Sequence, residues 1–343
     1  MAISRKLVSE KFKDEDRTVP LIDNAELRGR LVVPEDIPVL SELLLDAFGD
    51  ERFGNLEYME WFYLKSPFGR MVSGVTWLDG KAINHLGAAP RRLRTVNGFI
   101  DLWLVTNIGS RPGLQGKGYF MRLCLAGWML ALEYKAMGIY GVMNDRSVKA
   151  LRTFGVVTEA ELPVKVLLPG PFKPGTWTHH PVTEEFLDSD QFDEILQDTD
   201  LPPRRGVRHW WDAETLRWRL RCPLNPYTVH VHEDLVAISA RVKVKGVPTA
   251  ILMKAMIRGA RRKKVGVRKT WLSPTAIGAI CAHHRTPFAL YAGVNADVRV
   301  MGVVIPQQYL PSPLHLCFKV DAQAVATDDL RFDTFELLDF DVI

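Results

Sequence analysis

The chain has 343 residues, of which 47% are hydrophobic and 24% are charged, and its formal net charge is +4. This length and composition suit a globular protein of two domains, each with enough apolar residues to fill a core. No uninterrupted apolar stretch approaches the roughly 20 residues that cross a bilayer, which excludes a membrane-spanning class. The first six residues lead into a charged segment rather than an apolar signal core, so we expect a cytoplasmic protein without a membrane partner.

The charge and the cysteines argue against two further classes. A charge of +4 over this length does not by itself indicate nucleic-acid binding, although it suits partners that carry phosphate. Cys124, Cys222, Cys281 and Cys317 are far apart in the sequence and lack the close pairing of a structural zinc site or a redox pair. We therefore expect them to be buried small hydrophobic residues, and we expect no metal.

The N-terminal part begins with an arm and a helix. Residues 1–26 are polar and rich in charge, so we interpret them as an arm that precedes a first domain over 27–168. Pro34 then begins a segment in which apolar residues recur every three or four positions until Gly49. This period, with Pro near the first turn, predicts an amphipathic helix that ends at Gly49.

A sheet and two further helices are predicted after this helix. Apolar runs separated by turn sequences predict an antiparallel meander with strands over 71–77, 82–88 and 99–108. The pattern becomes helical over 119–136, indicates a short buried strand over 139–143, and becomes helical again over 147–154. The predicted fold class is α/β of the α+β kind, with a mixed, mostly antiparallel sheet that helices flank.

A domain boundary is predicted at residues 168–175, which contain three prolines and two glycines. Neither a helix nor the interior of a sheet accepts so many of these residues. We assign 169–200 to a linker and connecting segment, and 201–343 to a second domain.

The second domain carries a faint copy of the first. One pattern occurs at 62–67 and again at 218–223: an aromatic residue is followed by a Leu two positions later and a Pro five positions later. The sequence Ile139–Asn144 is matched by Leu290–Asn295, in the same order and at a similar separation. These matches favour a duplicated fold with a degenerate second copy.

A glycine-rich loop lies between the last strand of the meander and the helix that follows it. Its sequence is Gln115-Gly116-Lys117-Gly118-Tyr119-Phe120. Glycines let the backbone curl so that successive N–H groups point into one concavity, and the start of the helix adds the positive end of its dipole. Together they predict a pyrophosphate cradle with Lys117 at its rim, while a turn without a ligand remains the alternative.

The run Gln-x-x-Gly-x-Phe at 115–120 resembles the acyl-CoA pyrophosphate loop of the GNAT superfamily, whose usual form is Gln/Arg-x-x-Gly-x-Gly/Ala. Phe120 departs from this form because it replaces a small residue. A second motif, from Asn144 through Ser147 to Gly155, resembles the family's strand-end Asn, helix and closing Gly, with the family's spacing. Two motifs in the right order lead us to expect a GNAT-like fold for the first domain.

The resemblance implies acetyl-CoA as co-substrate. Its pantetheine arm would lie between the strand before the loop and the strand before Asn144. The implied contacts are with the main chain of Ile108, Gly109 and Ser110, and with Asn144 and Ser147 at the far lip. Asn is also a good helix N-cap, and both roles can hold at once.

The implied reaction is direct attack of a neutral amine on the thioester, which needs a proton acceptor and stabilisation of the oxyanion and the thiolate. Asp101, at the start of the strand that leads to the loop, is the candidate base, and Glu60 and His85 are lesser candidates. The family's common Tyr, seven residues after the Asn, is Leu151 in this chain. The acid step then falls to Tyr140, to water or to no group.

Two features of the second domain have open interpretations. The basic run over 258–269 lies where the repeat would place a second phosphate loop, and it is either a solvated loop or a partner-binding segment. Four aromatic residues are expected in the core, with stacking on a sugar or planar amine as the alternative. They are Trp210, Trp211, Trp218 and Tyr227.

The sequence therefore predicts an N-acetyltransferase that transfers an acetyl group from acetyl-CoA to a primary amine of a small molecule, sugar or peptide. The whole chain resembles two-domain bacterial GNAT proteins. One alternative is a non-catalytic acyl-CoA sensor or scaffold, which the missing Tyr favours. Another is an acetyltransferase that acts on a macromolecule through the basic run.

Overall fold

A computed structural model describes most of the chain, and the helices and strands below are those of the residues it describes. They are 17–20, 25–114, 118–133, 136–153, 155–171, 174–197, 199, 201–224, 226–258, 270–321 and 330–340. The chain divides into two compact units, each built from separate stretches of sequence. Unit 1 comprises Met1–Arg92, Ile100–Ala160 and His315–Thr327, and unit 2 comprises Leu93–Phe99, Glu161–Leu314 and Asp328–Ile343.

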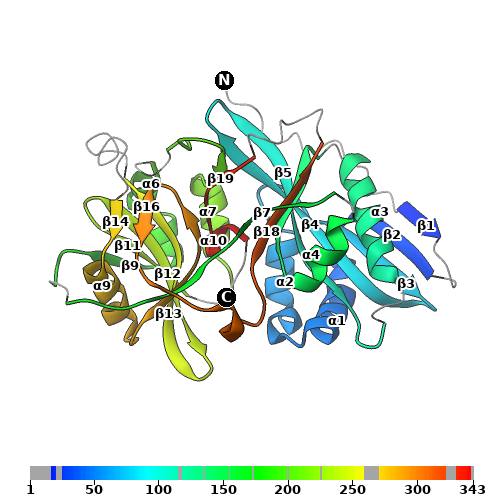
Figure 1. The fold of residues 1–343 in the computed structure, drawn as a ribbon, viewed down its shortest axis with the longest axis horizontal. Coiled ribbons are helices and arrows are strands. Elements are labelled where there is room, and N and C mark those ends of the chain that lie inside the picture. Colours follow the sequence, from blue (N-terminus) through cyan, green and yellow to red (C-terminus); the bar gives the residue numbers. More distant parts are fainter. Residues whose placement is uncertain are drawn as a thin grey trace. The chain divides into compact units, whose positions relative to one another are not determined.

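The core of unit 1 is a mixed sheet in the strand order β1-β2-β3-β4-β5-β6-β18-β7 (Figure 1). Strands β1 to β4 pair antiparallel in succession, β5 and β6 are parallel, and β6 and β18 are antiparallel. The strands are β1 (Arg17–Pro20), β2 (Ala25–Leu31), β3 (Val72–Leu78), β4 (Lys81–Thr95), β5 (Phe99–Ser110), β6 (Gly138–Met143), β7 (Val157–Glu161) and β18 (His315–Val320).

Helices cover both faces of this sheet. They are α1 (Ile37–Phe48), α2 (Leu56–Tyr63), α3 (Tyr119–Glu133) and α4 (Asp145–Arg152), with short 3-10 helices at Pro34–Asp36 and Glu51–Gly54. A Cβ on Gly127 of α3 would touch Leu86 of β4, whereas the ring of Tyr63 in α2 lies against His85. Because consecutive residues of a strand point to opposite faces, α3 and α2 pack on opposite sides.

Most elements predicted for this region are confirmed. The helix α1 ends at Gly49, whose φ of 64° is left-handed, as the glycine suggested. The three meander strands appear within a few residues of the predicted limits, except that β4 runs on to Thr95. The helix predicted over 147–154 begins earlier, at Asp145, because the side chain of Asn144 caps it by accepting a hydrogen bond from the Ser147 N–H at 2.9 Å.

Unit 2 has a sheet of related topology, in the order β9-β11-β12-β13-β15-β8-β17, and β19 and β10 extend it from β15. Its strands are β8 (Val164–Leu167), β9 (Thr178–Pro181), β10 (Val207–His209), β11 (Tyr227–Val231), β12 (Leu235–Val244), β13 (Val247–Ile257), β15 (Ala289–Asn295), β17 (Val303–Val304) and β19 (Phe332–Glu336). A separate parallel pair joins β14 (Thr270–Leu272) and β16 (Val298–Val300).

The described helices of unit 2 are short apart from α9. They are α5 (Glu184–Leu187), α6 (Asp190–Gln197), α7 (Ala213–Leu220), α9 (Pro274–His284) and α10 (Leu337–Phe340), with a 3-10 helix at Gln307–Tyr309. The segment 169–200, which the sequence left as a connection, contains β9, α5 and α6, and β9 pairs with β11.

The two units repeat one succession of elements, and this confirms the duplicated fold. In unit 1 the order is α2, the meander β3-β4-β5, α3 and β6. In unit 2 it is α7, the meander β11-β12-β13, α9 and β15. The last meander strand pairs in parallel with the strand after the helix in both units. The matched sequences 62–67 and 218–223 begin within α2 and α7 and run past their ends, and Ile139–Asn144 and Leu290–Asn295 coincide with β6 and β15.

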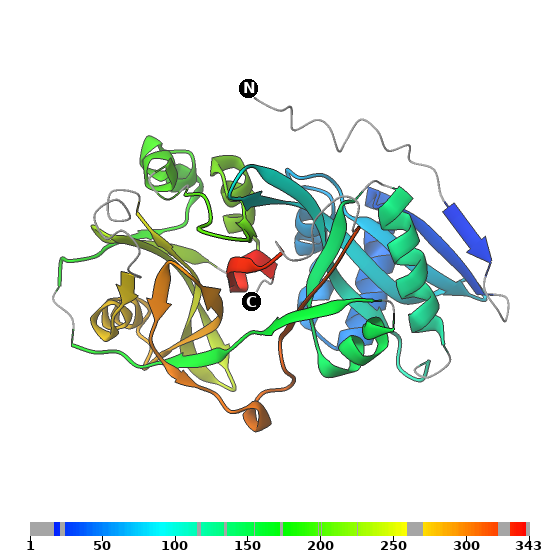
Figure 2. The same ribbon diagram turned by 45° about the horizontal axis from the view of Figure 1, so that its top comes forward.

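Each unit also takes one strand from the other half of the sequence. In unit 1, β18 lies between β6 and β7 (Figure 2). In unit 2, β8 lies between β15 and β17. These positions are equivalent in the two copies, so the duplication includes a reciprocal exchange of one strand.

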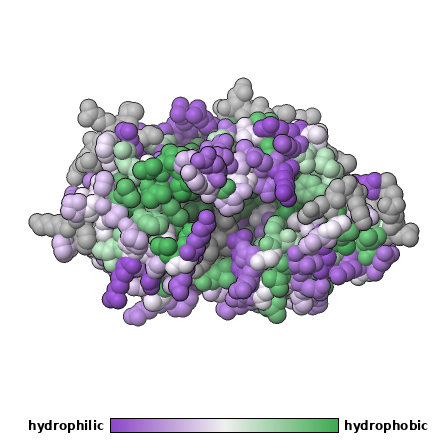
Figure 3. Space-filling view, turned by 60° about the horizontal axis from the view of Figure 1, so that its bottom comes forward, coloured by the Kyte–Doolittle hydropathy of each residue, from purple (hydrophilic) through white to green (hydrophobic). Residues whose placement is uncertain are grey.

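The buried residues follow the sequence expectations closely. All four cysteines are buried, and none forms a disulfide bond within the described part of the chain. Trp211, Trp218 and Tyr227 are buried as predicted, whereas Trp210 is half-buried. Val303, Val304 and Tyr309 are exposed, and apolar surface gathers in patches on the face drawn in Figure 3. Within the described part of the chain, no helix has the length and apolar character needed to span a membrane.

Candidate functional site

The candidate site of unit 1 begins where two parallel strands separate. Among the described residues, the β5–β6 ladder pairs Trp103 with Ile139 and Leu104 with Tyr140. Gly141 still lies close, since a Cβ there would come within 2.7 Å of the Val105 carbonyl oxygen. Beyond this point the ladder ends, although β5 continues to Ser110. The end of β5 therefore presents main-chain groups toward the gap without a strand partner there.

The loop after β5 is described in part. Gln115, Gly116 and Lys117 lie outside the described residues. Gly118 has a φ of 79°, and a Cβ added to it would meet no atom of the described residues within 4 Å. This left-handed conformation favours glycine, and α3 begins at the next residue. The first N–H groups of a helix have no acceptor within it, so the described part of the loop faces open space with hydrogen-bond donors at its end.

The two aromatic residues after Gly118 pack inward rather than into the loop. Tyr119 is buried in a small cluster with Ala25 and Ile83. Phe120, which departs from the usual motif, packs against the main core of the unit. The large side chain at this position is therefore accommodated by the core.

Arg111 ties helix α1 to the end of β5. Its Nε donates to the Ala82 carbonyl oxygen at 2.7 Å, and its two terminal nitrogens donate to Asp46 at 2.7 Å and Glu42 at 2.8 Å. Because this buried guanidinium is engaged by α1 and β4, it serves to position the start of the loop.

Gly109 has a packing role that its sequence position did not reveal. A Cβ at Gly109 would lie 2.8 Å from the ring of Phe48, so α1 rests directly on the backbone of β5. Ile108, the preceding residue, packs against the core. A larger residue at 109 would push α1 away from the strand.

Near the end of β5, Asn107 joins His85 and Tyr63 in a partly buried hydrogen-bond network. Asn107 has a left-handed φ of 52°, which interrupts the regular course of β5. His85 Nδ1 lies 2.7 Å from the Asn107 carbonyl oxygen, which only accepts, so Nδ1 carries the proton. The Asn107 amide donates to the Tyr63 hydroxyl at 2.8 Å. These bonds hold the irregular residue in place.

The other ring nitrogen of His85 is exceptional. Burial lowers the pKa of His85 to about 4, although its hydrogen bond to Asn107 acts in the opposite direction. The imidazole is therefore neutral near pH 7, and Nε2 presents a lone pair. That atom is buried and has no hydrogen-bond partner among the described residues. The sequence named His85 only as a lesser candidate for the base, and it did not predict that Nε2 would be a buried acceptor.

The predicted catalytic residues lie in different surroundings. The Asp101 carboxylate accepts two hydrogen bonds from Arg92, at 2.8 and 3.0 Å, and is half-exposed. It precedes Ile108 by seven residues, or about 23 Å of extended strand, so it lies far from the loop. Tyr140 is fully buried on β6. Glu60 is exposed and pairs with Lys65 at 3.0 Å.

The far lip of the gap carries Asn144 at the end of β6. Its side chain caps α4 through Ser147, so the capping interpretation is confirmed, and both residues are at least partly exposed. Leu151, which replaces the family's Tyr, is buried in the core. No hydroxyl stands at this position.

The equivalent gap in unit 2 is filled. Strands β13 and β15 pair over Ala250–Leu252 and Ala289–Tyr291, and β19 then pairs with Gly293–Asn295. The Gly293 N–H donates to the Pro163 carbonyl oxygen, on the edge of β15 that pairs with β8. Strand β19 therefore lies along the opposite edge, which faces β13.

Two side chains complete this closure. The Glu336 carboxylate accepts from the Ala255 N–H at 3.3 Å, and Asn295 Nδ2 donates to the Ala255 carbonyl oxygen at 2.8 Å. The main chain of β13 that would line an open gap is thus engaged by the protein itself. Of the basic run after β13, Arg258 donates to the His232 carbonyl oxygen at 3.3 Å, and 259–269 lie outside the described residues.

No family model and no curated protein matches the chain. Solved structures do match. A GCN5-related N-acetyltransferase from Anabaena variabilis is 12% identical over 86% of this chain and 72% of that chain, with a TM-score of 0.56. A tandem GNAT protein from the clavulanic acid biosynthesis pathway is 10% identical over 88% of this chain and 100% of that chain, with a TM-score of 0.51.

An N-myristoyltransferase from Saccharomyces cerevisiae is 9% identical, with 90% of this chain and 81% of that chain covered and a TM-score of 0.53. At such identities the likeness concerns the fold. Together with the repeated succession of elements, it identifies the protein as one with a two-domain GNAT-type fold.

Proposed function

We propose that the protein is an acyl-CoA-dependent N-acetyltransferase that transfers an acetyl group from acetyl-CoA to a primary amine of a small molecule, sugar or peptide. The observation that carries this proposal is that the β5–β6 ladder ends at Leu104 and Tyr140 while β5 runs on toward the left-handed Gly118, which directly precedes α3.

The described residues fit acetyl-CoA as co-substrate. The end of β5, at Ile108, Gly109 and Ser110, offers main-chain groups to the amides of a pantetheine arm. Gly118 and the first turn of α3 would offer N–H groups to a pyrophosphate, since a Cβ at Gly118 would meet no atom of the described residues within 4 Å. Asn144 and Ser147 would border the same gap.

Bound acetyl-CoA supplies a thioester carbonyl that a neutral amine can attack. The protein must then accept a proton from the amine nitrogen as the C–N bond forms and the C–S bond breaks. We assign the base to Asp101 and the acid to Tyr140.

A non-catalytic acyl-CoA sensor is the second candidate. It is favoured by Leu151 in place of a Tyr and by the complete burial of Tyr140. Such a protein would bind acetyl-CoA without releasing a thiol.

Thiol release from acetyl-CoA, measured across a panel of primary amines, tests both proposals. An enzyme gives amine-dependent free thiol, which a Gly118→Asp variant loses. A sensor gives a calorimetric signal with coenzyme A and no thiol release with any amine. Absence of both signals would refute the assignment of this site to acyl-CoA.

A further inference from the structure

Unit 2 contains a group of four histidines that the proposed acyl transfer does not use. His179 lies on β9, His230 on β11, and His283 and His284 in the last turn of α9 (Figure 1). His179 and His230 are directly opposed in the antiparallel β9–β11 pair, so their side chains point to the same face of the sheet. The ring of His283 stacks on that of His179, and its Nε2 lies 3.3 Å from the hydroxyl oxygen of Thr228 on β11.

Hydrogen bonds join three of these rings into a chain. His179 Nδ1 lies 2.6 Å from His230 Nδ1. On the other side of the same ring, His230 Nε2 lies 2.6 Å from Ser239 Oγ of β12, and that oxygen lies 2.7 Å from His284 Nε2. We call this row, from His179 to His284, the His chain. Its middle members His230 and Ser239 are fully buried, whereas His179 is half-buried, so the chain has one end near solvent.

Each of the three contacts in the His chain holds one hydrogen. In one arrangement of neutral rings, His179 donates to His230, which donates to Ser239 through its other nitrogen. The hydroxyl then donates to His284, and in the second arrangement all three bonds are reversed. One added proton is also accommodated, because a charged ring can still donate to its neighbour. A second proton either sets two N–H groups against each other or leaves the Ser239 hydroxyl hydrogen without an acceptor in the chain.

The groups around the His chain oppose positive charge. Among the described residues, the titratable or charged side chains that act on it from β9, α9 and β12 are His180, His283 and Arg241. Each is positive when ionised. Burial, reinforced by neighbouring cationic groups, lowers the pKa of His284 to about 4 and the pKa of His230 well below its usual range. The folded unit therefore takes up protons at this place less readily than an opened one.

We propose that the His chain is an acid-sensitive latch, which holds β9 on β11 near neutral pH and releases β9 when a second proton binds. Like charges at the opposed positions His179 and His230 destabilise the strand pair. Strand β9 is at the edge of the described sheet of unit 2, where it pairs with β11, so its release leaves the β11–β12–β13 ladder intact. Histidine suits this role because its charge changes in the mildly acidic range.

Hydrogen exchange read by mass spectrometry at pH 7 and pH 5, without acetyl-CoA, tests the latch separately from the acyl-transfer proposal. Protection factors, which correct for the effect of pH on intrinsic exchange, are compared for peptides that cover β9 and β13. The released strand accepts a proton that the paired strand excludes, so the protection of β9 should fall about tenfold or more at pH 5. The protection of β13 should not change.

The test variant is His179→Gln, and the matched control is His180→Gln. Gln at position 179 can still bond to His230 but takes up no proton, so acid should lower the protection of β9 severalfold less than in the parent. His180 is the next residue of β9, faces the other side of the strand and stacks on Phe186, so His180→Gln should respond to acid as the parent does.

Three results would overturn the proposal. The protection of β9 could persist at pH 5, β13 could lose as much protection as β9, or the two variants could respond to acid alike. If His179→Gln fails to fold by circular dichroism, the comparison of β9 with β13 in the parent decides.

Discussion

The charged cluster that fills the gap of unit 2 can be tested by removing its cation. Lys254 Nζ lies 2.9 Å from Asp339 and 3.4 Å from Glu336, and none of the three side chains is more than 7% exposed. Burial raises the pKa of Glu336 to about 7, against the opposing effect of Lys254. Trp211 also donates to Asp339, at 2.8 Å. The cluster holds β19 and α10 against β13.

Replacement of Lys254 by Met keeps the length of the side chain but leaves two buried carboxylates without a cation. Breaking a buried pair in this way costs about 3 to 5 kcal/mol. The control is Lys65→Met, because the ion pair of Lys65 with Glu60 is exposed, with 57% and 48% of the side-chain surfaces accessible. An exposed pair contributes at most about 1 kcal/mol.

Urea unfolding followed by circular dichroism at pH 7 measures both variants. In Lys254→Met the carboxylates should take up protons more readily in the folded than in the unfolded state. The folded variant then binds more protons, so its stability relative to the parent should recover as the pH is lowered from 7 toward 5. A cost equal to that of Lys65→Met, or one independent of pH, would show that the cluster does not hold the gap closed.

Three further outcomes are expected. Gly118→Asp should retain the fold by circular dichroism and weaken coenzyme A binding by about tenfold to a thousandfold in calorimetric titration, and unchanged affinity would remove this loop from the site. Protonation of His85 should cost the parent about 3 kcal/mol of stability as the pH falls from 6.5 to about 4, because the unfolded state takes up the proton first. Urea titrations of His85→Gln should lack this loss. Asp101→Asn should lower kcat for amine acetylation, whereas Glu60→Gln should not; equal rates for Asp101→Asn and the parent would dismiss Asp101 as the base.

The local elements could be predicted from the sequence because their signals are local. The spacing of apolar residues up to Gly49 determines α1, and the turn residues between 78 and 81 determine the β3–β4 hairpin. Asn144 was recognised as a helix cap because Asn accepts readily from the backbone two or three residues on. Gly118 was recognised from its motif, and its left-handed φ explains why the motif needs glycine.

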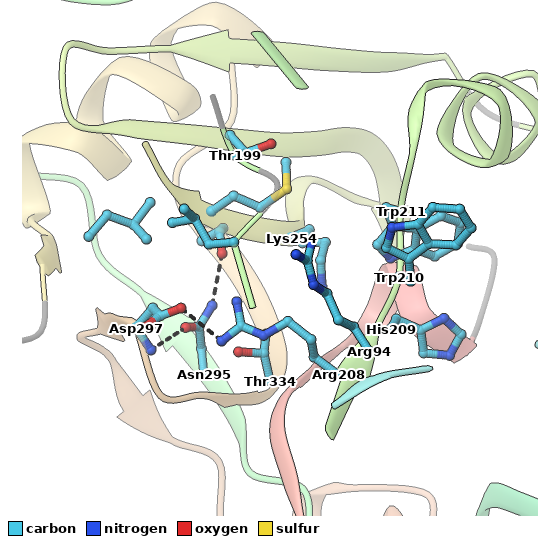
Figure 4. Close-up of a pocket in the computed structure, with 14 residues that line it drawn as sticks. Arg94, Thr199, Arg208, His209, Trp210, Trp211, Lys254, Asn295, Asp297 and Thr334 are labelled. Carbon is cyan, nitrogen blue, oxygen red and sulfur yellow. Dashed lines mark hydrogen bonds and ion pairs between the residues drawn. The ribbon is translucent and has the colours of Figure 1, made fainter. Parts of the chain in front are cut away.

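Contacts between distant parts of the chain could not be predicted in this way. The exchange of β8 and β18 depends on which strand edges are free in the folded protein, and no pattern within either strand records this. The three bonds of Arg111 reach back to α1 and β4, and neither partner is a neighbour in the sequence. Four opposed positions on separate strands also come together, at Arg94, Arg208, Thr334 and Asn295 (Figure 4). Each of these contacts is set by tertiary structure.

The two copies of the fold differ at the place proposed for the acyl donor. In unit 1 the strands beyond Leu104 and Tyr140 separate, whereas in unit 2 the corresponding space holds β19 and the buried carboxylate of Glu336. Opening the second gap would expose a buried ion pair and break the β15–β19 ladder, so coenzyme A cannot enter it without disrupting the unit. We therefore expect one coenzyme A per chain in calorimetric titration of the parent. A stoichiometry of two would mean that β19 and α10 leave the gap, and that both copies retain the ancestral site.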